Sequence, residues 1–382
     1  MSQQFEVQFV RSIAEIPKQQ WNRVVNTDYP FIQYEFLEAL ELSGATTGDT
    51  GWQPFHLTLV RDAELVALMP LYLKNHSYGE YVFDFQWANA YHQSGLEYYP
   101  KLVSSIPFTP VSGQRIYFDS SINQETLYPI ILKALKQLCT TNQVQSWHLL
   151  FPQQEESHRL KALSVCQRTG VQYHWMNKQY LNFDEFLGRC NKKHRNNMKR
   201  ERRRVLQQNV EVELYEGPQI TDEMWRSFYY FYQLTYAKRS GHDGYLNQAF
   251  FETIGKVMPE KIVMSVARFQ NEMVAASLFF RDKQSLYGRY WGCRAEFDCL
   301  HFELCYYQGI DYCINHRLSL FDAGAQGEHK IQRGFQPVKT YSNHFISHPL
   351  FSDAIKKFTS EELTHVNELI EQLTERLPYK ST

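Results

Sequence analysis

The chain has 382 residues with 40 basic and 41 acidic side chains, and a formal net charge of −1 excludes a protein that holds nucleic acid through bulk positive charge. Its length fits two domains of typical size or one large domain, and 43% hydrophobic residues are enough for a sizeable core. Seven scattered cysteines without a C-x-x-C pair argue against a zinc site or a disulfide framework.

No run of about 18 apolar residues predicts a membrane span. The first ten residues also lack the basic and apolar regions of a signal peptide. Together with the cysteine usage, these features predict a soluble protein of the reducing cytoplasm that binds no metal.

Apolar periodicity and turn formers predict the elements of the first half. They are a helix at 34–42, strands at 55–60 and 65–73, a helix from Asn123 to Leu138, a strand at 147–151 and a helix at 155–168.

The second half shows antiparallel strand patterns that lead into a helix and one more strand, which indicates an α+β fold and not a doubly wound sheet. The predicted elements are a strand at 210–214, a helix capped by Thr221, strands at 263–269, 274–280 and 286–292, a helix at 300–316, strands at 318–321 and 341–346, and a helix at 360–377.

Two short motifs recur at nearly the same offset. Glu64-Leu65-Val66-Ala67 returns 208 positions later as Glu272-Met273-Val274-Ala275, and Tyr78-Gly79-Glu80-Tyr81 returns after 209 as Tyr287-Gly288-Arg289-Tyr290. Such self-similarity is the mark of a duplicated unit. We therefore expect a repeated β-meander and two similar domains, residues 1–180 and 181–382.

Polar and titratable residues gather between positions 286 and 337, where predicted strands end and loops begin. α/β folds place their sites at such ends. The cluster predicts a site, and the alternative for each single residue is a solvated loop charge or a hydrogen-bonded core group. Its members are Tyr287, Arg289, Trp291, His301, Glu303, Asp322, Glu328, His329, Lys330 and Arg333.

A second feature is the basic run at 192–204, with eight lysines and arginines against one acid, Glu201. Met198 and Val205 are its main candidates for packing. A solvated helix face is the usual role of such a run, but its charge density favours phosphate binding. The ligand would be a nucleotide carrier, RNA or an acceptor that bears a pyrophosphate.

These features resemble the GNAT acyltransferases. The basic helix with the strand that follows it, the hairpin at 272–275, and Phe321-Asp322-Ala323-Gly324 before Arg333-Gly334-Phe335 carry the likeness. Over residues 25–355 the chain resembles the bacterial FemAB-like branch of N-acyltransferases, related to FemA and FemB. This resemblance implies two GNAT-like domains in tandem, with mainly antiparallel central sheets flanked by helices.

The chain also departs from these relatives. The Q/R-x-x-G-x-G/A pyrophosphate loop of GNAT proteins is not readable in Gly292-Cys293-Arg294-Ala295-Glu296-Phe297. The coiled-coil arm of some peptidoglycan-bridge enzymes has no counterpart.

The resemblance implies an N-acyltransferase that moves an acyl or aminoacyl group from acyl-CoA or aminoacyl-tRNA to an amine by direct attack. The acceptor would be a small molecule or a cell-wall precursor. One alternative is an aminoacyl-tRNA-dependent transferase that acts on peptidoglycan precursors. Another is a non-catalytic tandem module that binds anions or a protein partner. Helix 192–204 would contact tRNA, and DNA is not an expected partner.

Acyl transfer needs a base and a donor for the developing oxyanion. Glu328 and His329 are the preferred catalytic candidates, followed by Glu303, His301 and Asp322. His301 and Glu303 are two residues apart, so a regular helix would point them to different faces, with His301 beside Cys305. The substrate-binding candidates are Tyr287, Arg289, Trp291, Lys330, Arg333, Lys193, Arg195, Arg200, Arg202 and Arg203.

Overall fold

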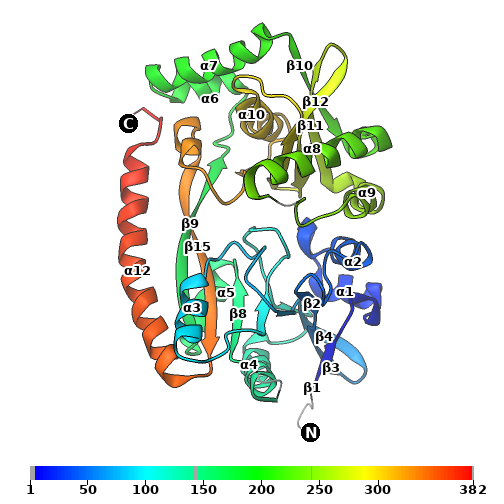
Figure 1. Cartoon of the computed structure of the whole chain (residues 1–382), viewed down its shortest axis with the longest axis vertical. Coiled ribbons are helices and arrows are strands. Elements are labelled where there is room, and N and C mark those ends of the chain that lie inside the picture. Colours follow the sequence, from blue (N-terminus) through cyan, green and yellow to red (C-terminus); the bar gives the residue numbers. More distant parts are fainter. Residues whose placement is uncertain (1–4, 142–143, 242, 381–382) are drawn as a thin grey trace. The chain divides into compact units, whose positions relative to one another are not determined.

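The computed structural model describes residues 5–141, 144–241 and 243–380, and the chain forms two compact units (Figure 1). The first unit contains the N-terminal residues through Thr27, Phe31–Gly170 and Lys339–Glu368. The second contains Asp28–Pro30, Val171–Val338 and the residues from Leu369 onward. The chain therefore enters the second unit near residue 170, where the sequence suggested 180, and it returns to the first unit for about 30 residues.

The first unit has two sets of strands. One has the order β1 (Glu6–Val10), β3 (His56–Arg61), β4 (Glu64–Met69) and β7 (Tyr117–Phe118). The other has the order β15 (Gln336–Ile346), β8 (Ser146–Leu150), β6 (Lys101–Ser104), β5 (Tyr72–Lys74) and β2 (Trp52–Pro54). Its helices are α1 (Lys18–Val25), α2 (Tyr34–Leu42), α3 (Phe85–Gln93), α4 (Gln124–Thr141) and α5 (Gln154–Ala162), and α12 (Pro349–Glu375) starts there.

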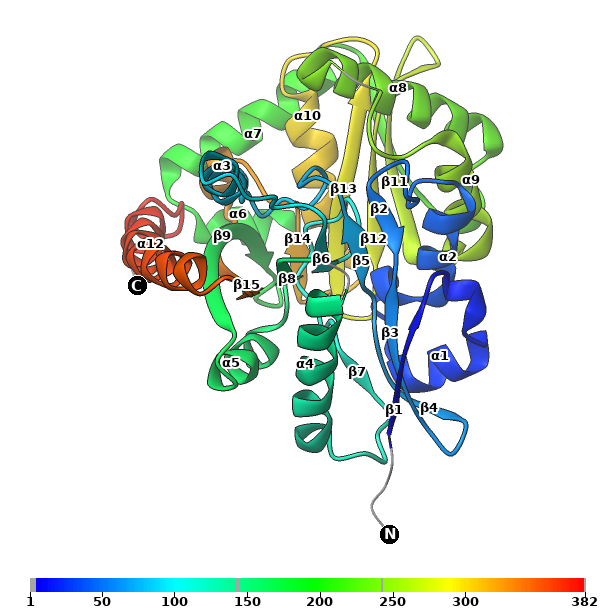
Figure 2. The same ribbon diagram turned by 60° about the horizontal axis from the view of Figure 1, so that its bottom comes forward.

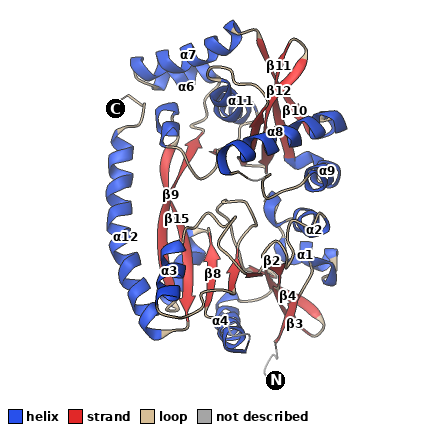
Figure 3. Ribbon diagram, in the orientation of Figure 1, coloured by secondary structure: helices blue, strands red, loops and turns tan. Residues whose placement is uncertain are grey.

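The second unit has the strand order β10 (Val210–Glu216), β11 (Ile262–Phe269), β12 (Glu272–Arg281), β13 (Ser285–Cys293), β14 (Leu320–Asp322) and β9 (Cys166–Met176). Its helices are α6 (Phe183–Arg189), α7 (Lys192–Gln207), α8 (Asp222–Ser240), α9 (Gln248–Val257), α10 (Leu300–Phe302) and α11 (Gln308–Asn315). Helix α8 lies against β12 (Figure 3) and also against β13. It approaches β13 so closely that a Cβ on Gly292 would collide with the Phe231 backbone.

Each unit contains one parallel strand pair joined by a helical crossover. In the first unit β6 runs parallel to β8 through α4 (Figure 2). In the second unit β13 runs parallel to β14 through α10 and α11. The pairs β1–β3, β3–β4, β10–β11, β11–β12 and β12–β13 are antiparallel. Three of these pairs, β3–β4, β11–β12 and β12–β13, are hairpins of consecutive strands. The predicted α+β class is confirmed.

The duplicated hairpin is confirmed in detail. Asp62 and Ala63 turn the β3–β4 hairpin with φ of 53° and 64°, and Gln270 and Asn271 turn the β11–β12 hairpin with φ of 52° and 64°. A two-residue turn with both residues in the left-handed region fits the twist of the two antiparallel strands that it connects. A bulge follows at the same place in both hairpins.

The second half of the predicted repeat is wrong. Tyr287 to Tyr290 lie in β13, whereas Tyr78 to Tyr81 form an irregular turn with positive φ at Gly79 and Tyr81. The counterpart of β13 in the first unit is the parallel strand β6. The motif match at offset 209 therefore has no structural basis.

Most predicted elements lie within a few residues of observed ones, and the errors have local causes. Helix α5 ends at Ala162, and the predicted helix up to 168 covers the start of β9. Helix α12 starts at Pro349, earlier than the predicted Ser360. Within the described ranges, no helix is both long and apolar enough to cross a membrane, and all seven cysteines are free thiols.

Candidate active site

The helix that starts at Leu300 contains a π-helical turn at Glu303–Tyr307 between α10 and α11. This wider turn places His301 against Tyr306, with ring centroids 5.3 Å apart, where a regular helix would place it beside Cys305. The His301 ring also lies 5.3 Å from the Trp291 ring of β13. The π turn therefore assembles an aromatic cluster, which consists of Trp291, His301, Phe302, Tyr306 and His329.

His329 is the exposed member of the aromatic cluster. Its Nε2 atom lies 2.9 Å from the Tyr306 hydroxyl, and its ring centroid lies 6.3 Å from that of His301. Partial burial, together with the positive charges of Arg333 and Lys330, lowers the pKa of His329. Burial and the neighbouring His329 lower the pKa of His301 to about 3. Both rings are therefore neutral at pH 7, but a pKa of about 3 makes His301 a poor base, which leaves His329 as the candidate proton acceptor.

Glu328 is separated from this arrangement, although it is next to His329 in the sequence. Its carboxylate pairs with Arg376 at 3.3 Å, and both side chains are more than half exposed. Glu328 and His329 therefore do not form one catalytic set, and of the two only His329 remains a candidate.

Asp322 is neutralised by a buried ion pair. The Arg289 guanidinium lies 3.1 Å from Oδ1 and 2.5 Å from Oδ2, and the Gly324 N–H donates to Oδ1 at 2.9 Å. His174 on β9 lies 3.7 Å from Oδ2. Burial alone would raise the pKa of Asp322, but Arg289 and His174 lower it to about 2. Such a carboxylate is a poor base at neutral pH.

Glu303 is also held by cations and amides. It accepts from Arg202 at 3.0 Å and from Gln308 at 2.8 Å, and Arg202 reaches Asp311 at 2.8 Å as well. Glu303 therefore joins the crossover helix to α7. This role supports a structural function for both Glu303 and Arg202.

Arg333 and Lys330 hold the loop that follows β14. Arg333 pairs with Glu201 at 2.8 Å and lies 3.5 Å above the Phe302 ring. Lys330 is 2% exposed, and its ammonium donates to the carbonyls of Ala323 at 2.8 Å and Gly324 at 2.7 Å. Burial lowers the pKa of Lys330 to about 8. Both cations thus bond to groups of the protein itself, and these bonds fix the position of His329.

Only part of the basic run on helix α7 faces outward without a carboxylate partner. Met198 and Val205 are each 1% exposed, as predicted. Glu201 and Arg202 stand between these two residues at helical spacing, so they lie on the same inward face. Lys199 pairs with Asp184, and Arg204 pairs with Asp298. We call the remaining exposed cations the basic face of α7: Lys192, Lys193, Arg200 and Arg203. Arg195 is half-buried.

Strand β13 extends beyond its parallel partner. The pairing with β14 covers Ser285 to Tyr287, whereas β13 continues to Cys293 with β12 as its strand neighbour on one side. The hydroxyl of Tyr287 donates to Asp282 at 2.7 Å and is not available at this edge. Trp291 is a half-buried residue of this extension, and its ring joins the strand to the aromatic cluster.

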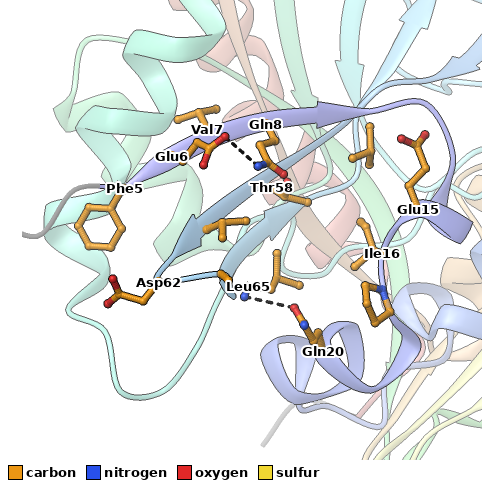
Figure 4. Close-up of a pocket in the computed structure, with 14 residues that line it drawn as sticks. Phe5, Glu6, Val7, Gln8, Glu15, Ile16, Gln20, Thr58, Asp62 and Leu65 are labelled. Carbon is orange, nitrogen blue, oxygen red and sulfur yellow. Dashed lines mark hydrogen bonds between the residues drawn. The ribbon is translucent and has the colours of Figure 1, made fainter.

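A groove in the first unit has a volume of about 960 Å³ and is lined by residues of β1, β3 and α1 (Figure 4). Gln20 accepts the Leu65 N–H at its edge, and Glu6 accepts from Gln8. None of the predicted site residues lines it.

Sequence reasoning missed Tyr306, His174 and Glu201. Glu201 had a signal, since it lies at helical spacing from Met198 and Val205. Tyr306 had none, because only the π turn brings it to His301. No group of three metal-binding side chains occurs in the part of the chain that the structure describes.

Each unit combines an antiparallel meander with a parallel pair, and the fold is that of two GNAT-like units in tandem. The family model FemAB-like, described as peptidoglycan biosynthesis/recognition, matches residues 12–381, so the chain belongs to this family of transferases.

Several solved structures are similar to this chain. FemX is similar at 13% identity and a TM-score of 0.53, over 89% of this chain and 98% of that chain. The C-terminal domain (DUF2156) of a lysylphosphatidylglycerol synthetase homologue from Agrobacterium fabrum is similar at 8% identity and a TM-score of 0.53, over 90% and 96%. A tandem GNAT protein from the clavulanic acid biosynthesis pathway has 8% identity and a TM-score of 0.49, over 91% and 99%. No curated protein sequence matches the chain.

Proposed function

We propose that the protein is an N-acyltransferase that moves an acyl or aminoacyl group from a carrier to an amine by direct attack. The observation that carries this proposal is the contact chain from the β13 extension through Trp291 and His301 to the Tyr306–His329 pair. A strand edge can bind an extended carrier arm, and a neutral histidine next to it can accept a proton.

In this mechanism the amine nitrogen attacks the carbonyl carbon of the donor. The Tyr306 hydroxyl passes its proton to Nε2 of His329 and receives the proton that the amine loses. The tetrahedral intermediate then breaks the bond to the carrier, whose thiolate or alkoxide leaves with the proton from His329. Burial raises the pKa of Tyr306, so its hydroxyl is protonated before substrate binds. A proton relay requires this state.

The basic face of α7 would bind the phosphates of the carrier. Its four exposed cations suit acyl-CoA as well as aminoacyl-tRNA, whose phosphates attract lysine and arginine alike. The family's description favours a cell-wall precursor as the acceptor. We therefore propose aminoacyl transfer to a peptidoglycan precursor in the cytoplasm as the first version to test. Transfer from acyl-CoA to a small amine is the second version.

His329→Ala is expected to lower kcat by roughly 10²–10⁴-fold with a smaller change in KM, because it removes the proton acceptor but not the donor contacts. Transfer is measured by mass spectrometry of the acceptor, with acyl-CoA or charged tRNA as donor. The matched control is Glu328→Gln, one residue away, whose carboxylate pairs with exposed Arg376. We expect this variant to keep kcat within a few-fold. Unchanged turnover in His329→Ala would contradict the assignment.

A further inference from the structure

The segment from Asn75 to Leu96 in the first unit has an unusual surface. It holds two charged carboxylates, Glu80 and Asp84, and no lysine or arginine, in a chain that is 21% charged. Both carboxylates are buried, with 2% and 3% exposure. What the segment presents outward is therefore mainly aromatic rings, amides and imidazoles, together with Leu96.

Three aromatic side chains of this segment are exposed. Tyr78 and Phe83 are each 58% exposed, and Phe85 is 46% exposed. The ring centroids of Phe83 and Phe85 lie 6.2 Å apart at an interplanar angle of 26°, and Tyr78 lies 6.1 Å from Phe85. Exposed aromatics gathered in this way indicate a binding surface. We call these three residues the aromatic platform.

Helix α3 extends the platform with polar groups. Trp87 and Tyr91 form its buried face and pack with Ile346 and Ile355. Gln86, Asn89 and Gln93 are exposed at helical spacing on the opposite side, next to Phe85. Uncharged amides that both donate and accept hydrogen bonds thus border the exposed rings.

A buried ion cluster holds the platform rigid. The Lys101 ammonium, which is fully buried, donates to Ser77 at 2.8 Å, Glu80 at 2.8 Å and Asp84 at 2.5 Å. These three partners alternate along the chain with Tyr78, Phe83 and Phe85. The rings are therefore presented on a fixed backbone, which lowers the entropy lost on binding.

Charge decides which ligand fits. Two cations bond to backbone carbonyls of the platform, and neither is available to a ligand. Arg168 donates to the Phe83 carbonyl and pairs with Glu362 at 2.7 Å. Lys74 donates to the Tyr78 carbonyl at 3.2 Å and is fully buried. Phosphates and anionic lipid surfaces need unpaired cations, which the segment does not supply. The C–H face of a neutral pyranose ring stacks on the electron-rich face of an aromatic ring, and its hydroxyl or acetamido groups bond to amides.

We propose that the aromatic platform and the amide face of α3 bind a neutral oligosaccharide. The test is calorimetric titration of the full chain with a β-1,4-linked tetramer of N-acetylglucosamine and, separately, with maltotetraose. Saturable binding of the acetylated sugar alone supports stacking with amide recognition. Binding of both sugars supports stacking alone.

Phe83→Ala and Phe85→Ala are each expected to weaken binding by about tenfold, and the double variant should show no saturation. Both side chains are exposed, so the variants should fold. Tyr230→Ala is the matched control, because Tyr230 is 53% exposed but lies on α8 in the second unit. Absence of saturable binding to either sugar at millimolar concentration overturns the proposal, as does full affinity in the double variant. No acyl donor is present, so the result is independent of the transfer assay.

Discussion

Asp322→Asn is expected to lower the free energy of unfolding by about 3–5 kcal/mol, because it leaves the Arg289 guanidinium buried without its counter-ion. Each side chain of this pair is 2% exposed, so water cannot replace the lost carboxylate. The measurement is urea unfolding, with hydrogen exchange of β13 and β14 to assign the loss to the second unit.

The double variant Arg289→Met/Asp322→Leu is the control, and it should recover most of the loss, since apolar groups often replace a buried ion pair without cost. The pH dependence gives a second check. The folded-state pKa of Asp322 is lowered to about 2, so its stabilisation is present above the ordinary pKa of 3.8 and is lost as pH falls toward 2. Asp322→Asn should lack this loss. A cost below about 1 kcal/mol would show that the pair is not essential for stability.

Lys101→Met is expected to destabilise the first unit by at least about 3–5 kcal/mol, because it leaves two carboxylates buried. Lys101 is the partner of both Glu80 and Asp84. Burial already raises the pKa of Glu80 to about 7. Hydrogen exchange across residues 75–100 should increase together with the loss of stability measured by urea unfolding.

The pH dependence of Lys101→Met is specific. Without the ammonium, the folded-state pKa of both carboxylates lies above the unfolded-state value, so stability falls as pH rises through the interval between them. The deficit should therefore be larger at pH 8 than at pH 5. Glu80→Gln and Asp84→Asn added to Lys101→Met should remove this dependence. An equal deficit at both pH values would contradict the account of the cluster.

Local patterns predicted much of the fold. Helix α2 was predicted at its observed bounds. The repeated hairpin was visible because the first residues of its second strand recur, although its turn residues differ. The π turn at Glu303–Tyr307 could not be predicted, since regular helical spacing cannot show an added residue. The exposed aromatics at Tyr78, Phe83 and Phe85 were not distinguishable from core residues by type alone.

The candidate site was predicted as a region but not in its roles. The sequence placed titratable groups at the end of β14, yet charge counting could not show that Arg289 neutralises Asp322 or that Arg202 holds Glu303. These partners are 33 and 101 positions apart in the sequence, and only the folded chain brings them together. His329 remains because it is exposed and hydrogen-bonds to Tyr306.

The most direct test of the acyltransferase assignment is the unfolding temperature of the full chain with acetyl-CoA, longer acyl-CoAs, and aminoacyl-tRNA with its uncharged form as control. A ligand that binds the folded state raises this temperature with concentration. We expect a rise with an acyl donor, and a smaller rise when Lys193, Arg200 and Arg203 are replaced by glutamine. If no donor raises the unfolding temperature, the chain does not bind an acyl carrier, and the proposed transfer reaction is contradicted.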